Sequence, residues 1–545
     1  MKKNVLLLLF SFTIAIQQLA AQCVETPKPK VLLVGDSWAF FMNTDQTFNN
    51  ALKNWGHSNY KFVSNTVVAE NGAEAPDFMT ATKQTEIQNL IDQNPSIEVI
   101  HLSIGGNDMM GDWKVSMTPG ALDTLGNNVQ ANIDSVIRFL KSTKPGMRVV
   151  WGGYTYPNFG EVINTSPLQS SHPFYQTWQD MEFPSFIDIN NLLNRFSDTV
   201  ATKAAADPQL DFVNATGLMQ YTFGQTSPLG VPPGGTYAAM SLPLPLGDPN
   251  YPSPAVSMRD YFVTKDCFHL SAPGYLALIE YNIQKFYHKL FMDDFYALSE
   301  NNNQTGSVSS TGNISTSLLV GESAGESFST VLSFNTSGMA DTTLSKASIF
   351  LRREALSGSN PVSGTLDVKM KIGNFGATAA VEAADFSAPS DMNGTPCRFG
   401  DNNTNHWIRL DLPASFLALI NNQAPVQFMI SAPGFTGGTV TFSNTDEPEW
   451  APVLNLAYGE TPSAVGEITT LDKFKLYPNP VNDVMQLDID LGTAVRVEIH
   501  NTMGQLMPVN VINYNTISTS NLPAGNYIIT VVTEDGIGSQ RFVKQ

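Results

Sequence analysis

The sequence predicts an α/β domain built on a parallel sheet, followed by two all-β domains. Over residues 30 to about 296, short β-branched runs alternate with longer helical patterns, which is typical of a parallel sheet with crossover helices. Over residues 316–458, and again over 471–545, period-two runs separated by Gly, Asn and Pro indicate antiparallel strands. The fold class follows from these changes of pattern.

Five short runs are the predicted strands of the first domain: KVLLVGDS, YKFVSNTVV, IEVIHLSIGG, MRVVWGGY and LDFVNAT. Between the third and fourth runs, apolar residues recur at helical spacing and form one face that can cover a sheet. They are Val129, Ile133, Val136, Ile137 and Leu140. Because a parallel sheet binds its ligands at the carboxyl ends of its strands, the residues directly after each run are the candidates for function.

Polar segments rich in Gly, Ser and Asn mark the predicted joints between domains. The stretch SENNNQTGSVSSTGNIST predicts a linker over residues 298–315, after a first domain of residues 22–297. The stretch GETPSAVGEITT predicts a second linker over residues 459–470, between a β-sandwich of residues 316–458 and a last small β unit of residues 471–545.

The chain begins with the pattern of a secretory signal peptide, predicted over residues 1–21. Two lysines precede an apolar run over residues 5–16, and two alanines end the segment. A membrane anchor is the alternative, but the run is shorter than the roughly 20 residues that a spanning helix needs. Cys23 leaves a lipoprotein open, although Gln22 stands where such signals usually carry a small residue. We therefore expect an exported protein.

Charge and cysteine content limit the partners. The formal net charge is -19 and no Lys/Arg stripe offsets it, so we expect no nucleic-acid partner, and acidic membrane surfaces are disfavoured. The chain has three cysteines, Cys23, Cys267 and Cys397, so it can form one disulfide at most and must leave one thiol. They lack the close ligand pairs of a structural zinc site. We expect no metal and no cofactor.

The first domain carries the residues of a serine nucleophile and its base. The first strand ends in Gly35-Asp36-Ser37, and a serine hydroxyl is a weak nucleophile unless a base accepts its proton. Asp266 and His269 follow the last predicted strand, and a turn can bring both side chains to one site. We predict that His269 takes the Ser37 proton and that Asp266 orients the imidazole.

Two further turns can supply donors to an oxyanion. Gly72, in AENGAEAP after the second strand, offers a backbone N–H, and Asn107, in SIGGND after the third, offers a side-chain amide. The Ser37 N–H would be the third donor. Taken alone, each motif is an ordinary cap or turn. Together they follow different strands of one sheet, which favours a shared site.

Four blocks in this order resemble the SGNH/GDSL hydrolase family: GDS ending at Ser37, the glycine Gly72, GGND around Asn107, and DCFH ending at His269. The resemblance covers about residues 30–297. It implies a flavodoxin-like parallel sheet with a nucleophile, two further oxyanion donors and an acid–base pair on these residues. The sequence departs from the family at Trp38, where Leu is commoner, and in the long segment between Tyr154 and Asp260, which leaves the substrate open.

The two β domains carry resemblances of their own. LSKASIFLRR, NHWIRLDLP and APVLNLAYG resemble the DNRLRE-type β-sandwich of secreted hydrolases, where Trp407, Phe435 and Trp450 could stack on sugars or pack inside the sandwich. LYPNPVND, VRVEIHNTMGQLM and LPAGNYIITV resemble the C-terminal sorting domain of Bacteroidota type IX secretion. That resemblance implies export by the type IX machinery, followed by release or surface attachment.

The sequence as a whole predicts a secreted hydrolase that cleaves lipid or short-chain acyl esters through an acyl-Ser37 intermediate. Aromatic and Met residues near the motifs favour an apolar acyl group or are local core: Trp38, Phe40, Phe41, Met109, Met110 and Trp113. A polysaccharide deacetylase of the same family is the nearest alternative. A non-catalytic surface protein that binds glycans, and a metal-dependent phosphoesterase using Asp266 and His269, are two others. The sequence does not predict the oligomeric state.

Overall fold

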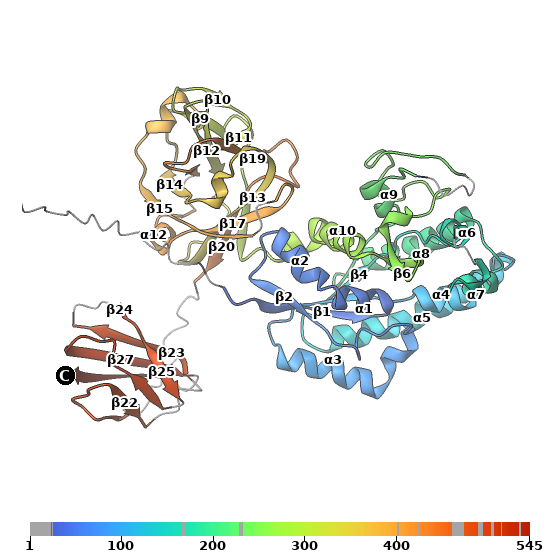
Figure 1. Ribbon diagram of the computed structural model, residues 1–545, viewed down its shortest axis with the longest axis horizontal. Helices are drawn as coiled ribbons and strands as arrows, with labels where there is room; N and C mark the ends of the chain where they lie inside the picture. The colour runs from blue at the N-terminus through green and yellow to red at the C-terminus, as the bar shows by residue number, and fades with distance from the viewer. Residues whose placement is uncertain are drawn as a thin grey trace, which may run out of the picture. The chain divides into compact units, whose positions relative to one another are not determined.

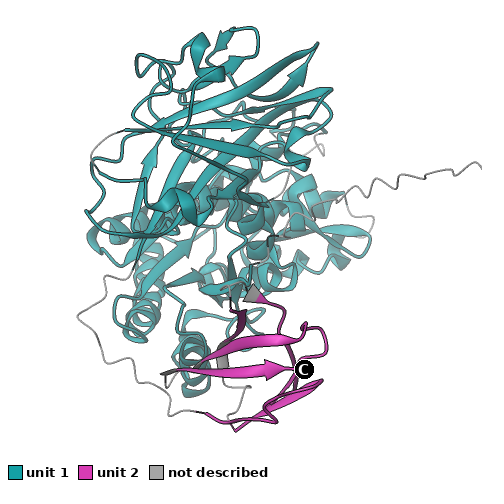
Figure 2. Cartoon of the chain, turned by 90° about the vertical axis from the view of Figure 1, so that its left-hand side faces the viewer, with its two compact units in different colours: residues 1–459 teal, residues 460–545 magenta. Residues whose placement is uncertain are grey.

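The computed structural model describes residue 23 and residues 25–165, 169–227, 233–400, 403–422, 425–459, 474–488, 494–502, 506–513, 515–533 and 536–545 (Figure 1). The predicted signal peptide and nearly all of the predicted linker 459–470 lie outside these residues. The chain divides into two compact units, residues 1–459 and 460–545 (Figure 2). Among the described residues, no helix has both the length and the apolar character needed to span a membrane.

The first unit contains a five-stranded parallel sheet in the order β2-β1-β3-β4-β5. Its strands are β1 Lys28–Gly35, β2 Tyr60–Val63, β3 Val99–Ser103, β4 Arg148–Gly152 and β5 Leu210–Val213. This order is the flavodoxin-like one, in which the strand order reverses between β1 and β3 and ligands bind at that point. The predicted fold class, a flavodoxin-like sheet followed by all-β domains, is confirmed.

Helices cover both faces of this sheet. Figure 1 shows α3 on one face and α2 and α10 on the other. Helix α5 buries the five apolar residues that the sequence pattern had grouped, from Val129 to Leu140. The helices are α1 Ser37–Thr44, α2 Thr47–Asn54, α3 Ala81–Gln93, α4 Gly106–Asp112, α5 Pro119–Ser142, α6 Gly160–Asn164, α7 Tyr175–Asp180, α8 Phe186–Ala206, α9 Leu218–Phe223, α10 Ala272–Asn282 and α11 His288–Leu290, with a π-helical turn Ile283–Tyr287 between the last two.

A two-stranded hairpin, β6 Met258–Tyr261 and β7 Thr264–Leu270, comes at the end of the long segment after Tyr154, in which the sequence predicts one strand, LDFVNAT. The hairpin is separate from the parallel sheet. Strand β7 carries both Asp266 and His269. These two residues, predicted on a turn, therefore lie on a strand.

An antiparallel β-sandwich completes the first unit. Its long strand β13 belongs to two layers, because its first part pairs with β17 and β20 and its last part with β19. Apolar side chains from both layers meet in one core, as at Val320, Phe428 and Leu454. The elements are β8 Phe295–Leu298, β9 Gly306–Ser309, β10 Ile314–Ser315, β11 Leu318–Ser323, β12 Glu326–Phe334, β13 Leu344–Gly358, β14 Asp367–Ile372, β15 Met392–Gly394, β16 Cys397–Gly400, β17 Trp407–Asp411, α12 Ala414–Leu417, β18 Val426–Ser431, β19 Gly438–Phe442 and β20 Val453–Tyr458.

The structure differs from the linker predicted over residues 298–315. Strand β8 pairs with β20, and β9 pairs with β12, so both belong to the sandwich. Residues 306–309 are buried throughout. The small polar side chains are satisfied inside the fold, because the Ser307 hydroxyl donates to the carbonyl of Ser317 at 2.7 Å. The polar composition of this segment thus belongs to a buried strand with short hydroxyl side chains and not to a flexible linker.

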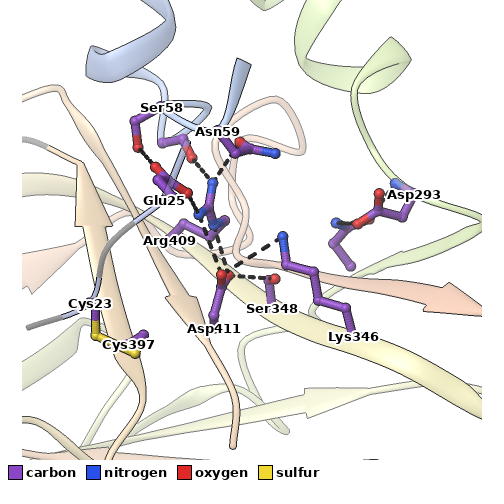
Figure 3. Close-up of polar contacts among 12 residues, drawn as sticks. Cys23, Glu25, Ser58, Asn59, Asp293, Lys346, Ser348, Cys397, Arg409 and Asp411 are labelled. Carbon is purple, nitrogen blue, oxygen red and sulfur yellow. Dashed lines mark hydrogen bonds and ion pairs between the residues drawn. A yellow bond between two sulfur atoms is a disulfide. The ribbon is translucent and has the colours of Figure 1, made fainter. Parts of the chain in front are cut away.

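Contacts between the α/β lobe (residues 25–294) and the sandwich lobe (residues 295–459) centre on a buried arginine (Figure 3). Arg409 is 1% exposed and forms an ion pair with Glu25. Its other guanidinium nitrogens bond Asp411 at 2.7 Å and Asn59 at 2.6 Å. A buried cation is tolerated only where carboxylates and acceptors surround it, so this cluster fixes the sandwich lobe to the α/β lobe.

A disulfide and an aromatic stack reinforce this contact. Cys23, near the start of the described chain, is bonded to Cys397 on β16, with 5.5 Å between the Cα atoms (Figure 3). Because its thiol is used in this bond, Cys23 is not available for the lipoprotein alternative. The ring of Trp407 stacks on Trp55 at 5.7 Å. Trp407 is fully buried. Of the two roles predicted for it, the structure therefore supports packing and not stacking on a sugar.

The second unit forms two four-stranded antiparallel sheets in its described residues, in the orders β21-β22-β26-β25 and β24-β23-β27-β28. Side chains such as Met485, Ile517 and Ile529 pack in one core, as expected of a small β-sandwich. The strands are β21 Leu476–Tyr477, β22 Val484–Leu487, β23 Ala494–Asn501, β24 Leu506–Met507, β25 Asn510–Asn513, β26 Thr516–Ser518, β27 Gly525–Thr533 and β28 Gly536–Lys544.

Replacing Arg409 should destabilise the first unit. The substitution Arg409→Met leaves Glu25 and Asp411 without their shared cation, so we expect the free energy of unfolding to fall by about 3 kcal/mol or more. Denaturant unfolding followed by tryptophan emission measures it. The matched control is Lys285→Ala, which breaks the exposed Lys285–Glu449 ion pair between the same two lobes and should change the free energy by less than about 1 kcal/mol. Equal effects of the two variants would contradict the role given to Arg409.

Candidate active site

The turn after β1 brings Ser37 to the carboxyl edge of the sheet. Gly35 has φ +151°, and a Cβ atom there would lie 2.0 Å from the carbonyl oxygen of Ser103 on β3. Only glycine therefore allows this approach of the two strands. Asp36 caps α1 by accepting the Trp38 N–H at 2.9 Å, so Ser37 is the first residue of that helix and is held at its N-terminus.

Ser37, His269 and Asp266 form a continuous chain of hydrogen bonds. The His269 Nε2 atom lies 2.7 Å from Ser37 Oγ, and its Nδ1 atom lies 2.8 Å from Asp266 Oδ2. The other Asp266 oxygen accepts the N–H groups of Phe268 and His269 at 2.9 and 2.8 Å. All three triad side chains are buried. The arrangement has the connections of a nucleophile, a base and a group that orients the base.

Asn107 lies beside this triad at the start of α4. Its side-chain amide donates to the carbonyl of Ala73 at 2.9 Å. The next residue, Asp108, accepts the Ala75 N–H with both oxygens at 3.0 and 3.1 Å. Asp108 is therefore a buried carboxylate that holds the loop after Gly72.

Gly72 lies three residues beyond the bridge that joins Ala69 to Gly35. Its φ of +84° suits glycine, it is exposed, and it is not among the residues that line the pocket beside Ser37. Asn107 does line that pocket. The assignment of Ser37, Gly72 and Asn107 as oxyanion donors stays a prediction.

Tyr154 is a site residue that the sequence analysis missed. Its hydroxyl donates to Asp36 Oδ2 at 2.5 Å and accepts the Gly106 N–H at 3.2 Å. It therefore joins the turn of the nucleophile to the turn of Asn107. Tyr154 follows the fourth strand, at the same edge of the sheet as the other candidates. This position after a strand end could have identified Tyr154 as a site residue from the sequence.

Burial controls the charge of Asp36. Desolvation raises the pKa of its carboxyl from 3.8 to about 6, although the hydrogen bond from Tyr154 opposes the shift. Burial and the neighbouring Asp36 raise the pKa of Tyr154 well above its ordinary value, so it stays a neutral donor. The Asp36 carboxyl thus has a structural role and a pKa of about 6.

An apolar pocket opens beside Ser37. One wall comes from α8, where Ile189, Leu192, Leu193 and Phe196 face it. These residues lie between the fourth and fifth predicted strands, where the sequence analysis named no helix, yet their i, i+3, i+4, i+7 spacing is the signal of an amphipathic helix. Of the six apolar residues predicted near the motifs, Trp38, Met109 and Met110 line the pocket, as does Phe268 from β7. Phe41 packs against the imidazole of His269 instead, at 4.9 Å.

Cys267 lies between the two motif residues of β7, Asp266 and His269. It is fully buried and free. Burial raises the pKa of its thiol well above the ordinary value, with a further contribution from Asp266, so the reactive thiolate is disfavoured. Cys267 is therefore the thiol that the single disulfide leaves free, and it packs in the core.

Nothing in the described part of the chain places a third metal ligand beside Asp266 and His269. No group of three His, Cys, Asp or Glu side chains that could hold a metal ion occurs among the described residues. The side-chain polar atoms of Asp266 and His269 are already hydrogen-bonded to each other, to Ser37 and to the N–H groups of Phe268 and His269. The metal-dependent alternative therefore has no support from this geometry.

Comparison with known proteins identifies the last part of the chain. Residues 475–545 match the family model of the secretion system C-terminal sorting domain. This domain indicates export across the outer membrane by the type IX machinery, so the protein is secreted or attached to the cell surface. A search of curated proteins found no match. The resemblance of the sandwich lobe to the DNRLRE type stays a prediction.

The α/β lobe has distant structural similarity to lipases and esterases. A GDSL-like lipase from Bacteroides thetaiotaomicron is 15% identical, over 48% of this chain and 89% of that chain, with a TM-score of 0.24. An extracellular lipase from Streptomyces rimosus is 16% identical, over 46% and 98%, with a TM-score of 0.25. A carbohydrate acetylesterase from Sinorhizobium meliloti is 10% identical, over 48% and 100%, with a TM-score of 0.25. These scores are too low to support a conclusion about what this chain does.

The raised pKa of Asp36 predicts a pH dependence of stability. Between about pH 4 and 6, folded Asp36 keeps a proton that the unfolded chain releases. Because the folded state binds more protons in this window, its stability falls as the pH rises, and the loss is complete above about pH 6. Asp36→Asn does not titrate, so its free energy of unfolding relative to the unsubstituted chain should rise by about 2 kcal/mol from pH 4 to 7. Denaturant unfolding of both proteins across this range measures the difference, and a constant difference would refute the shift.

Proposed function

We propose that the protein is a secreted serine hydrolase that cleaves carboxylic esters through an acyl-Ser37 intermediate. The observation that supports it is the chain of two hydrogen bonds from Ser37 Oγ through His269 to Asp266, at 2.7 and 2.8 Å, beside an apolar pocket. Burial strengthens these bonds because little water competes for them.

The first half of the reaction acylates Ser37. His269 Nε2 takes the hydroxyl proton while Oγ attacks the ester carbonyl, and Asp266 stabilises the imidazolium through Nδ1–H. The oxygen of the tetrahedral intermediate becomes negative and needs donors already aimed at it. The N–H of Ser37 at the start of α1 and the second amide hydrogen of Asn107 supply two, and the Gly72 N–H supplies the third. Collapse then expels the alcohol, which receives the proton from His269.

The second half releases the acid. A water molecule gives its proton to His269 Nε2 and attacks the acyl-Ser37 carbonyl, and collapse returns the proton to Ser37 Oγ. Atoms balance as one ester and one water giving one acid and one alcohol. No step needs a metal or cofactor.

The pocket favours an apolar acyl group. Its walls from α8 and α4 consist of aliphatic, Met and Phe side chains such as Leu193, Met109 and Phe196, and transfer of a methylene group into such a pocket contributes about 0.8 kcal/mol. We therefore rank esters of longer fatty acids above acetyl esters. A polysaccharide deacetylase would have the opposite preference.

Substitution of the nucleophile tests the reaction class. We expect Ser37→Ala to lower the initial rate on p-nitrophenyl esters by about a thousandfold or more, whereas Ser142→Ala, at an exposed serine at the end of α5, should leave it unchanged. A fluorophosphonate should label the Ser37 peptide in the unsubstituted chain alone. Absence of both labelling and hydrolysis, on acetylated glycans as well, would refute the proposal and favour the glycan-binding protein.

A second substitution tests the acyl pocket. Leu193→Phe adds volume to the α8 wall, so we expect the best p-nitrophenyl ester to shift toward shorter acyl chains, with about tenfold lower kcat/KM for long chains and little change for acetyl. The matched control is Ile187→Phe, at an exposed position of the same helix that does not line the pocket. An unchanged chain-length profile for Leu193→Phe would show that the acyl group binds elsewhere.

A further inference from the structure

The β6–β7 hairpin ends in two apolar side chains exposed to solvent. Phe262 is 92% exposed and Val263 is 91% exposed. They form the two-residue loop between the paired residues Tyr261 and Thr264. Among the described residues, the next most exposed large apolar side chain is Met240 at 72%. This hairpin tip, Phe262 and Val263, is therefore the most exposed apolar pair that the structure describes.

Local folding does not account for these residue types. Two-residue hairpin loops favour Gly, Asn or Asp, because at least one loop residue takes a positive φ. Phe262 has φ 52°, a conformation that is unfavourable for a bulky side chain. Its side chain also contributes nothing to a core. An exposed Phe is unfavourable both for the turn conformation and for the solubility of the protein. Its presence here therefore indicates a contact with something outside the chain.

A series of aromatic rings connects the tip to the candidate active site. The ring of Phe262 lies 5.1 Å from that of Tyr261, which lies 6.1 Å from Phe174. Phe174 lies 4.8 Å from Phe268, and Phe268 lines the pocket beside Ser37 and contacts the imidazole of His269 at 4.5 Å. A series of aromatic contacts thus leads from the tip to the pocket beside Ser37.

The charges near the tip are neutralised within the hairpin and its neighbours. Asp260 and Lys265, paired across the two strands, form an ion pair at 2.6 Å. Arg259 pairs with Asp45 at 2.8 Å. No cation is left over from these pairs to attract an anionic lipid, and the net charge of -19 repels one. The tip is therefore compatible with a lipid surface whose headgroups are neutral or zwitterionic and whose interior is apolar.

We infer that the hairpin tip inserts into the surface of zwitterionic lipid and holds the active site against long-chain acyl esters presented there. The inference deepens the proposed function, because it rests on Ser37 hydrolysing those esters, and it names the physical state of the substrate. Binding needs only the tip, whereas turnover needs the triad. Strand β7 connects the hairpin tip to the triad, because the tip ends three residues before Asp266 and six residues before His269.

Vesicle binding by the full chain tests the docking step. Sedimentation with phosphatidylcholine vesicles should bind the protein, and the paired change Phe262→Gly with Val263→Ser should lower the partition coefficient by about tenfold or more. Glycine suits the positive φ, so the thermal midpoint should not fall. The matched control, Ile314→Ser, removes a half-exposed apolar residue from β10 of the sandwich lobe and should leave binding unchanged. Addition of phosphatidylglycerol should weaken binding.

Catalysis separates this inference from the proposed function. The tip variant should keep its rate on soluble p-nitrophenyl acetate and its fluorophosphonate labelling, and lose about tenfold on long-chain esters embedded in the vesicles. Ser37→Ala should bind vesicles normally and hydrolyse neither. Vesicle binding through the tip without any hydrolysis would refute the esterase and leave the docking surface.

Three results would overturn the inference. They are absence of vesicle binding by the unsubstituted chain, equal binding by the tip variant, and a dimer in sedimentation velocity that the tip substitutions dissociate. The last would assign the tip to a second copy of this chain.

Discussion

The close approach of β1 and β3 at Gly35 is the constraint on which the candidate site depends. Any side chain at this position would meet the carbonyl oxygen of Ser103, so the two strands could not end side by side. Their ends carry Ser37 and Asn107, the two sides of the pocket where an ester carbonyl would sit. The switch in strand order between β1 and β3 leaves this edge open. One missing Cβ atom thus allows Ser37, the proposed nucleophile, and Asn107, the proposed amide donor, to line one pocket.

Polar contacts around that edge hold the groups in place. Tyr154 joins Asp36 to Gly106, and Asp108 joins α4 to the loop after Gly72. Each contact links two turns that come from different strands, and the bonds to Asp36 and Asp108 are buried, so they resist exchange with water. Catalytic groups need to be held to within a fraction of an ångström. The residues that meet this need are not themselves nucleophiles or bases, which is why a search for chemistry in the sequence passes over them.

The sequence predicts short-range features well and long-range contacts poorly. The motifs at Ser37 and His269 could be found because each contains its own turn or strand pattern, and the parallel sheet fixes where strand ends lie. The hydrogen-bond partners of Tyr154 and Arg409 could not be predicted. Tyr154 bonds to Asp36 and Arg409 to Glu25, and each pair is more than a hundred residues apart in sequence. Residues 298–315 were misjudged for a related reason. Serine-rich composition indicates a linker only where no neighbouring strand accepts its hydrogen bonds, and β12 does so here.

The apolar cores of the chain follow its division into two units. Both large cores of the first unit consist of residues before 460, and the core of the sorting domain consists of residues after 473. Among the described residues, no apolar cluster combines side chains of both units. Inside the first unit the opposite holds, because Arg409, the Trp55–Trp407 stack and the Cys23–Cys397 disulfide join the two lobes. A disulfide persists in the oxidising surroundings that an exported protein meets. The two lobes of the first unit are therefore held together by contacts that persist outside the cell.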